Sequence, residues 1–527
     1  MQNKRRNKSV AALLLALCFC MPLLTPLKTE RVLAAEQTGE TQIEGTQTGA
    51  DSGIHGVDDL PGKNIGVQIG TTGDNYATDY ENDEAGSKVT RFNKGADAVQ
   101  ALKQGKIDCV IIDEEPAKAF VEKNPELDIL EEEFVTDDYA ICISKKNTEL
   151  RDRINEALDI LSQNGTLKNI MSNYIGDETK GTMPYVSPEG LTRENGKLTM
   201  ATNVAFPPYE YYENGEAVGI DVDVARAIAD ILNMELVVSD MEFDSIIVAV
   251  QSGKADVGIA GMSVTEDRLK NIDFTNSYAI SKQVIMVKTG ESVSGVSLVE
   301  KIKQVFLKDG RWKYIPKGLL NTVIITLFAG FLGIILGFLF AIVRVYYERN
   351  DVRPVWIRIL NILVKLYLTV FRGTPVMVQL LIMYYVIFAS VKMNPIVAAV
   401  LAFGLNSAAY VAEAVRAGIM SIEIGQFEAG RSLGLTYGQT MTSIIMPQAI
   451  KNSLPTMCNE FIALLKESSI VGYIGLMDLT KAGDVIRSST YEAMLPLITV
   501  ALVYLLIVVV LTGFVGKLER RLKKDAR

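Results

Sequence analysis

Hydrophobic and polar positions follow two different patterns in this chain. Between residues 60 and 290, short apolar runs alternate with amphipathic stretches, which predicts strands alternating with helices. After residue 318, apolar runs long enough to cross a bilayer are separated by polar loops. A 48% apolar share beside a 22% charged share fits a soluble part joined to a membrane part. The alternating pattern makes the soluble part α/β, and the long apolar runs make the membrane part all-α.

The start of the chain has the pattern of an export signal. Lys4 to Lys8 are mostly basic, an apolar core runs from Val10 to Leu24, and small residues follow at Ala34 and Ala35. This order is typical of a secretory signal peptide over residues 1–35, so the region behind it is expected outside the cell. Residues 36–59 are rich in Gly, Thr, Gln and Glu, which predicts a flexible linker.

The α/β region divides into two blocks, 60–180 and 196–290, joined by a Gly- and Pro-bearing linker over 181–195. Ligands of such folds bind at the carboxyl ends of the strands. The predicted strands are Asn64–Gln68, Cys109–Ile112, Tyr139–Ile143, Leu198–Ala201, Glu235–Val238 and Val257–Ile259. The predicted helices are Ala96–Gln104, Glu149–Gln163, Thr166–Tyr174, Val222–Leu232 and Ser245–Gln251, besides one opened by Gly70–Asp74.

A tether over 291–318 leads to a transmembrane domain over 319–527. Five spans are predicted: Leu319–Val343, Phe371–Ala389, Pro395–Val415, Ile470–Leu479 and Leu495–Val515. Lys and Arg crowd the first loop at 344–358, the 428–447 loop and the tail. The positive-inside rule then predicts a multi-pass protein of the cell membrane with these segments in the cytoplasm and the α/β blocks outside.

Composition and missing motifs exclude several functions. A net charge of −9 argues against a nucleic-acid partner. The single histidine, His55, excludes a Ser-His-Asp triad and histidine-based metal sites, and the cysteines show no metal-ligand spacing. No Gly-x-x-x-x-Gly-Lys-Ser/Thr loop occurs, so this chain is not expected to hydrolyse ATP or to hold a cofactor.

A polar stretch between two spans carries the most specific pattern. Glu428, Ala429 and Gly430 are followed by Gly434 and then by Ile444-Ile445-Met446-Pro447. This spacing resembles the coupling loop of ABC importer permeases, with Gly430 for an alanine and Met446 for a leucine. The resemblance implies two short helices at a cytoplasmic surface that dock on a separate ATPase, which holds ATP and Mg²⁺. Phe371-Arg372-Gly373-Thr374-Pro375 resembles the signature of polar-amino-acid permeases of type I.

The two soluble blocks resemble the lobes of periplasmic polar-amino-acid-binding proteins (type II), in reversed order. The stretch from Ala201 to Tyr278 is similar to their first lobe. The stretch from Gly62 to Ser144 is similar to their second lobe, and the closing helices follow it. The chain therefore resembles a circular permutation of a bilobed binding domain, with one cleft in each chain expected. Pairing of lobes between two chains is the alternative.

The resemblance assigns roles in the cleft. A free amino acid needs a cation for its carboxylate, an anion for its ammonium and a wall for its side chain. The implied carboxylate site is Arg268 with Ser263, helped by the helix start at Gly70, Thr71 and Thr72. The implied ammonium site is Asp113 with the carbonyl of Gly261, and Phe206 with Phe243 would sandwich the side chain.

One position bears on the substrate. Asn203 stands where relatives that bind glutamine or basic amino acids often carry an acidic residue. An amide bonds a polar side chain but cannot neutralise a cationic one, which favours glutamine, another polar residue or cystine.

These patterns predict a receptor–permease subunit of an ATP-driven importer for a polar amino acid, with no enzymatic activity of its own. Its expected partners are an ABC ATPase, a second copy of the chain as a permease homodimer, and membrane lipid. The alternatives are an amino-acid-gated channel, for which no filter such as Thr-Val-Gly-Tyr-Gly is present, a dehydratase, and a permease with a vestigial binding domain.

Overall fold

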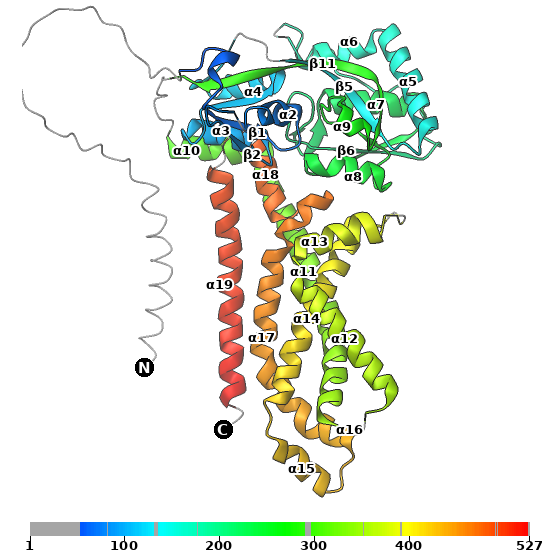
Figure 1. Ribbon diagram of the computed structural model, residues 1–527, viewed down its shortest axis with the longest axis vertical. Helices are drawn as coiled ribbons and strands as arrows, with labels where there is room; N and C mark the ends of the chain where they lie inside the picture. Colours follow the sequence, from blue (N-terminus) through cyan, green and yellow to red (C-terminus); the bar gives the residue numbers. More distant parts are fainter. Residues whose placement is uncertain are drawn as a thin grey trace, which may run out of the picture. The chain divides into compact units, whose positions relative to one another are not determined.

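A single mixed β-sheet runs through two lobes in the computed structural model (Figure 1). The structure describes residues 53–81, 83–130, 135–176, 178–289, 297–350, 353–389, 391, 393–490, 492 and 494–524. The predicted signal peptide and residues 36–52 of the predicted linker lie outside the described residues. Residues 53–59 belong to the N-terminal lobe, because Ile54 is buried in a core with Leu60 and Ile65, and Val57–Asp59 form the 3₁₀ helix η2.

The strand order of this sheet is β2-β1-β3-β11-β5-β10-β6-β9, with β4 beside β11. β1, β2 and β3 are parallel to one another, as are β6, β9 and β10. The N-terminal lobe contains β1 (Asn64–Gln68), α2 (Thr72–Thr78), β2 (Lys88–Phe92), α3 (Gly95–Lys103), β3 (Cys109–Asp113), α4 (Glu114–Lys123) and β4 (Leu127–Ile129). The C-terminal lobe contains β6 (Lys197–Thr202), β7 (Tyr211–Glu213), β8 (Glu216–Val218), α7 (Ile220–Ile231), β9 (Glu235–Asp240), η3 (Phe243–Ser245), α8 (Ile246–Gln251), β10 (Val257–Gly258) and α9 (Glu266–Leu269).

Two antiparallel strands connect the lobes. β5 (Val135–Ile143) and β11 (Asp273–Lys288) pair with each other. The first residues of β11 lie beside the end of β5, which pairs with β10 of the C-terminal lobe. The last residues of β11 pair with β3 and β4 of the N-terminal lobe. Because only these paired strands carry the sheet from one lobe to the other, they are the place where a hinge motion can occur.

All six predicted strands and the five predicted helices of this region form, within a few residues of the predicted bounds. The helices α5 (Thr148–Gln163) and α6 (Thr166–Tyr174) pack on the C-terminal lobe, where Leu158 and Ile170 share a core with Met200 and Ile228. The sequence pattern did not predict β2, α4, β4, the β7–β8 hairpin, α9 or β11.

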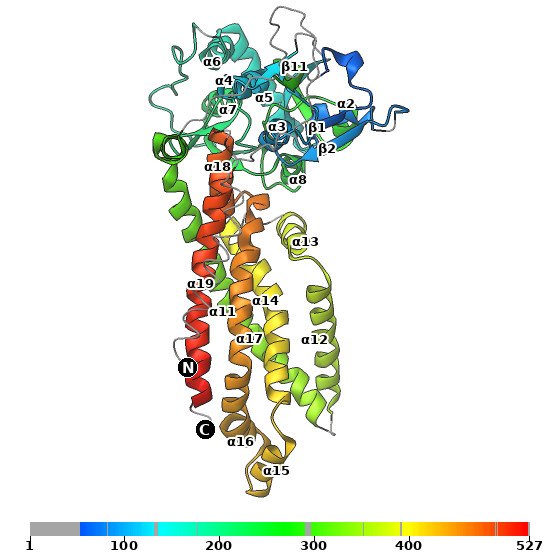
Figure 2. The same ribbon diagram turned by 90° about the vertical axis from the view of Figure 1, so that its left-hand side faces the viewer.

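The helical region contains long helices that lie side by side (Figures 1 and 2). They are α11 (Tyr314–Arg349), α12 (Val355–Gly373), α14 (Pro395–Met420), α17 (Met446–Glu467) and α19 (Met494–Lys524). Before α11 come α10 (Leu298–Ile302) and two short turns, η4 (Lys303–Leu307) and η5 (Lys308–Lys313), so the first long helix begins inside the predicted tether.

Among the described residues, three helical stretches are long and apolar enough to cross a membrane: Leu298–Arg349, Pro395–Met420 and Met494–Arg521. A fourth candidate is the pair Val355–Gly373 and Val376–Ile387, which is bent by 112°. The pair contains α12, then α13 (Val376–Leu381) and η6 (Ile382–Ile387). Pro375 explains the break, because a proline disfavours helical backbone in the residue before it. The Gly-Thr-Pro sequence thus ends one helix as well as beginning another.

The predicted span at Ile470–Leu479 is wrong. Residues Ser468–Ile474 form the short 3₁₀ helix η8, and α18 (Leu479–Thr490) begins only after a loop. The apolar side chains of Val471 and Ile474 are buried in protein and not in lipid. They belong to a core that also contains Met241 and Ile246 of the C-terminal lobe. The long helix in this part of the chain is α17. Its many polar residues interrupt the apolar run, so it was not predicted as a span.

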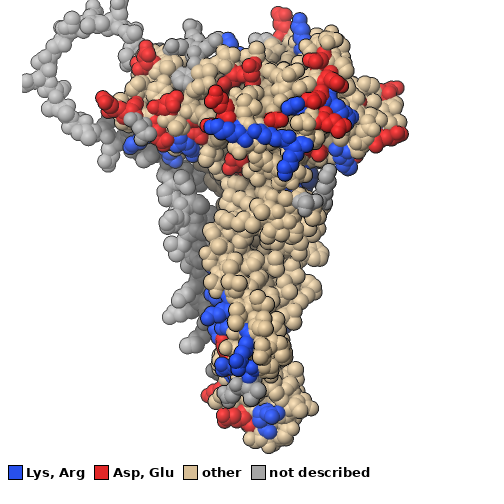
Figure 3. All heavy atoms as spheres, turned by 45° about the vertical axis from the view of Figure 1, so that its right-hand side comes forward, with Lys and Arg blue, Asp and Glu red and all other residues tan. Residues whose placement is uncertain are grey.

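On the face drawn in Figure 3, the half of the helical region nearer the lobes carries no charged side chains. Lys and Arg gather at the end where α15 (Ile424–Ser432) and α16 (Tyr437–Thr440) lie, as the ribbon views show (Figures 1 and 2). A band without charges is the surface that a bilayer requires.

Glycines let α11 and α14 approach closely. A Cβ added at Gly337 would lie 2.6 Å from Cγ1 of Val411, and one at Gly333 would lie 2.6 Å from Oγ of Ser407. Small residues are the usual means of close helix packing in membranes.

We expect Gly337→Leu to lower the thermal midpoint of the detergent-solubilised chain, because overpacking costs about 1–3 kcal/mol. The matched control is Gly513→Leu on α19, where an added Cβ meets no atom within 4 Å. Equal midpoints for the two variants would contradict the close packing of α11 and α14.

Candidate functional site

Both lobes line one pocket at the carboxyl ends of their strands. The N-terminal lobe contributes Gln68, Thr71, Thr72 and Asp113, and the C-terminal lobe contributes Asn203, Phe206, Glu210, Phe243, Ala260, Gly261 and Arg268. The free volume is about 10 Å³, close to the smallest space that holds one water molecule. The lobes are therefore closed on each other, and an amino-acid-sized molecule enters only if they separate.

Asp113 supplies a buried carboxylate at one side of the pocket. It follows the last apolar residue of β3 and is 6% exposed. Its Oδ1 accepts hydrogen bonds from Tyr139 Oη, from Ser281 Oγ at 3.2 Å and from Gln283 Nε2 at 2.7 Å. Burial raises the pKa of Asp113 to about 6, although the hydrogen bonds from Tyr139 and Ser281 act to lower it. A cationic group placed here would therefore stabilise the ionised carboxylate.

Arg268 supplies the opposite charge. The hydroxyl of Thr265 caps the short helix α9, which carries Arg268. The guanidinium donates to the carbonyl of Ser263 at 2.6 Å and to the carbonyl of Gly70 at 2.8 Å, and it lies 5.5 Å from the centre of the Phe243 ring. Burial lowers the pKa of Arg268, and nearby acidic groups such as Asp113 oppose this shift. A planar guanidinium in such a site suits a carboxylate.

Two hydrogen bonds cross from one lobe to the other beside this charge. Gly70 belongs to the N-terminal lobe, so the bond from Arg268 joins the lobes. Thr72 Oγ1 also donates to Ser263 Oγ at 2.7 Å. The residues predicted to hold a carboxylate therefore also make the contacts that keep the cleft closed.

An aromatic wall and a glycine shape the rest of the pocket. Phe206 stacks on Tyr209 with ring centres 5.9 Å apart. A Cβ on Gly261 would lie 2.9 Å from Cε1 of Phe206, and Gly261 has a φ of +50°, so a side chain at this position is excluded. The amide of Gly261 donates to Asp221 at 2.7 Å, which fixes the orientation of its peptide.

Eight of the ten residues predicted from the sequence line the pocket. The other two, Gly70 and Ser263, are bonded to Arg268 through their carbonyls. The amide nitrogen of Asn203 donates one hydrogen bond to the carbonyl of Met241 at 2.7 Å, which leaves the second N–H and the oxygen of this side chain without a hydrogen bond to that carbonyl.

The sequence reasoning missed Gln68, Glu210 and Ala260. Glu210 is fully buried, and burial, followed by the neighbouring Asp221, raises the pKa of its carboxyl group well above the usual value. Glu210 pairs through its backbone with Phe206 across the Pro-Pro turn. The Phe-Pro-Pro-Tyr-Glu run was a possible signal, but a single glutamate in a sequence is usually exposed.

The 428–447 segment forms two short helices, as the resemblance implied. Glu428 and Ala429 lie exposed on α15, whereas Gly430 is buried against Thr440 of α16. Gly434 turns the chain between the helices with a φ of +83°, and Thr436 with Gln439 forms a capping box on α16. Pro447 lies in the first turn of α17, behind the turn η7 (Met441–Ile445). Leu433, just after α15, is 81% exposed.

A family model, that of the bacterial extracellular solute-binding proteins of family 3, matches residues 198–472. The arginine transport system permease protein ArtQ of Bacillus subtilis (strain 168) is 40% identical over 216 residues, which are 40% of this chain and 94% of the relative. The putative glutamine transport system permease protein GlnP of Rickettsia prowazekii (strain Madrid E) is 37% identical over 214 residues, 39% of this chain and 94% of the relative. A crystal structure of an amino acid ABC transporter with histidines is 35% identical, with a TM-score of 0.38, and covers 43% of this chain and 100% of that one.

We expect Arg268→Ala to lower the affinity of the full chain for its amino acid ligand by about a hundredfold or more, because it removes a charge-assisted bond pair worth about 1.5–3 kcal/mol per bond. Arg226→Ala, at a partly exposed arginine that pairs with Asp223 in the same lobe, is the matched control. Titration calorimetry compares the two. Unchanged affinity in Arg268→Ala, with binding intact in the control, would remove Arg268 from the carboxylate site.

Proposed function

This chain belongs to the bacterial extracellular solute-binding proteins of family 3 and to the amino acid transport permeases, and we propose that it is a receptor–permease subunit that captures a polar amino acid and delivers it to its own permease. The observation that carries this proposal is the pocket between the two lobes, where Asp113 and Arg268 offer opposite buried charges. A zwitterion satisfies both of these charges at once, whereas an anion or a cation alone satisfies only one.

The substrate we favour is glutamine or a similar neutral polar amino acid. Asn203 and Glu210 both line the pocket. The Asn203 amide carries no charge, and burial raises the pKa of Glu210, which disfavours its charged form. An arginine ligand is the second candidate, because its guanidinium next to Glu210 would favour the ionised carboxylate.

We infer that the binding domain is a circular permutation with one cleft in each chain. The chain order is N-terminal lobe, closing helices α5 and α6, and then C-terminal lobe. Two observations support one cleft per chain: the pocket at the carboxyl ends of the strands has walls from both lobes of the same chain, and the closing helices share a core with the lobe that follows them.

The energy for transport would come from a separate ATPase that holds ATP and Mg²⁺. The exposed surface of α15 around Glu428 is the proposed docking site. The basic end of the helical region, where this surface lies, supports a cytoplasmic location for the loop and the tail. With one permease unit in each chain, we propose a homodimeric pore surrounded by lipid.

A thermal-shift screen of the full chain against the twenty amino acids tests the receptor. A ligand that binds only the folded state stabilises it by about 2.7 kcal/mol at a hundredfold excess over its Kd. We expect one or a few polar amino acids to raise the midpoint. If none does so in a chain that melts cooperatively, the binding domain is vestigial and another receptor supplies the permease.

We expect Glu428→Lys to reduce uptake into vesicles that contain the partner ATPase to less than a tenth, because it places the wrong charge in the docking surface. Amino acid binding should stay unchanged. Glu519→Lys on α19 is the control for a charge reversal elsewhere. Normal uptake by Glu428→Lys would show that α15 is not the docking element. Amino-acid-dependent ion flux without ATP would favour the gated channel instead.

A further inference from the structure

A buried cluster of seven charged residues joins both lobes to α18. The N-terminal lobe contributes Lys94 and Asp97, the C-terminal lobe contributes Asp240 and Glu242, and α18 contributes Lys481, Asp484 and Arg487. The three residues of α18 are spaced three apart, so they lie on one face of the helix. We call these seven residues the three-way cluster.

The cations of the cluster are deeply buried. Lys94, Lys481 and Arg487 are 4%, 5% and 9% exposed. Burial alone would lower the pKa of Lys481, but the charges of Asp240, Glu242 and Asp484 outweigh it and raise the pKa. Buried charges of this kind are stable only with their partners in place, because removing one partner leaves an uncompensated charge out of water.

Each part of the cluster contacts the other two. Lys94 lies 2.9 Å from Asp484 of α18 and 3.8 Å from Glu242 of the opposite lobe. Lys481 lies 3.1 Å from Asp240 and 3.6 Å from Glu242. Arg487 pairs with Asp97 and lies 2.9 Å from Asp484. The cluster is therefore complete only while the two lobes are closed and both contact α18.

Short connections lead from the cluster to the pocket in each lobe. In the N-terminal lobe, the amide of Gly95, next to Lys94, donates to Gln68 Oε1 at 3.0 Å, and Gln68 lines the pocket. In the C-terminal lobe, Asp240 and Glu242 belong to the same short segment as Phe243, which also lines the pocket.

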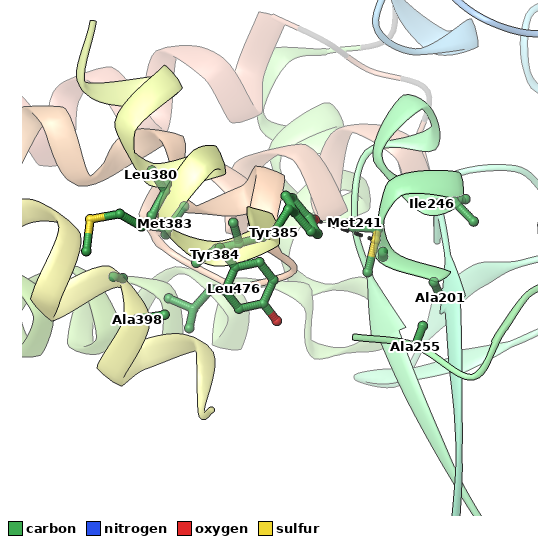
Figure 4. Packing of buried hydrophobic residues seen from close by; sticks show 14 of the residues in the cluster. Ala201, Met241, Ile246, Ala255, Leu380, Met383, Tyr384, Tyr385, Ala398 and Leu476 are labelled. Atoms are coloured by element: carbon green, nitrogen blue, oxygen red, sulfur yellow. Dashed lines mark hydrogen bonds between the residues drawn. The ribbon is translucent and has the colours of Figure 1, made fainter. Parts of the chain in front are cut away.

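An apolar contact lies beside the cluster (Figure 4). Met241, between Asp240 and Glu242, has its sulfur 3.9 Å from the hydroxyl of Tyr385 in η6, and that hydroxyl donates to the carbonyl of Tyr473 at 3.0 Å. The carbonyl of Met241 is the one that accepts from Asn203 of the pocket. The same four-residue segment, Asp240–Phe243, therefore touches both the pocket and the permease.

We propose that the three-way cluster is the surface by which the permease recognises the closed state of its own receptor lobes. The proposal rests on the proposed receptor function. Opening the cleft would move Lys94 and Asp97 away from Asp240 and Glu242, and α18 would lose one of its two sets of partners. Because binding effects are reciprocal, contact with α18 also favours closure and raises the affinity of the cleft.

Hydrogen–deuterium exchange of the full chain in lipid nanodiscs tests this contact without any ligand. We expect Asp97→Asn and Arg487→Gln each to raise the exchange rates of α18 amides at least fivefold, and the double variant to be no faster than either single one. The control pair is Glu115→Gln with Lys118→Gln, which neutralises an ion pair of α4 in the same lobe. Rates within twofold of the parent, or effects that multiply in the double variant, would overturn the proposal.

Addition of L-glutamine separates this proposal from the proposed function. We expect it to slow α18 exchange in the parent chain, and to bind the Arg487→Gln variant without slowing α18 exchange. Slowing in the variant equal to that in the parent would overturn the role of the cluster in sensing closure. A parent chain that binds no amino acid would instead contradict the receptor function, and the ligand-free comparison would still decide whether the cluster holds the contact.

Discussion

Closure of the two lobes depends on the hydrogen bonds that the guanidinium of Arg268 donates. The guanidinium joins the lobes through the carbonyl of Gly70 and lines the same pocket as Asp113. A ligand carboxylate that takes these donors replaces a neutral carbonyl by a charged acceptor, which makes a stronger bond. Ligand binding and lobe closure therefore draw on the same donors. The two crossover strands β5 and β11 let the lobes separate without breaking the sheet into two.

The elements that the sequence predicts correctly are those with one dominant pattern. β1 and β3 are short apolar runs between turn residues, and both form almost as expected. β11 escapes prediction because its first half, from Asp273 to Ile280, mixes polar and apolar residues and contains register shifts. It crosses between lobes, so its two halves have different surroundings and share no single period.

In the helical region, hydropathy fails where protein replaces lipid as the neighbour. The apolar segment from Ile470 to Leu479 packs against the binding domain, and the less apolar α17 packs among other helices. In the pocket, some residues can be predicted from the sequence and others cannot. A recognisable spacing in the sequence identifies Arg268, Asp113 and the two phenylalanines. Glu210 could not be predicted, because its place in the pocket follows from its burial, which the residue type does not reveal.

The connection between the two halves of the chain also sets the ratio of receptor to permease at one to one. β11 ends at Lys288 and α10 begins at Leu298, so only nine residues separate the receptor from the helices that lead into the first span. A link this short keeps the receptor at an effective concentration in the millimolar range or above. The receptor cannot diffuse away or be outnumbered by a competing one. In the proposed homodimer, two tethered receptors would share one pore, so each must leave it before the other can deliver.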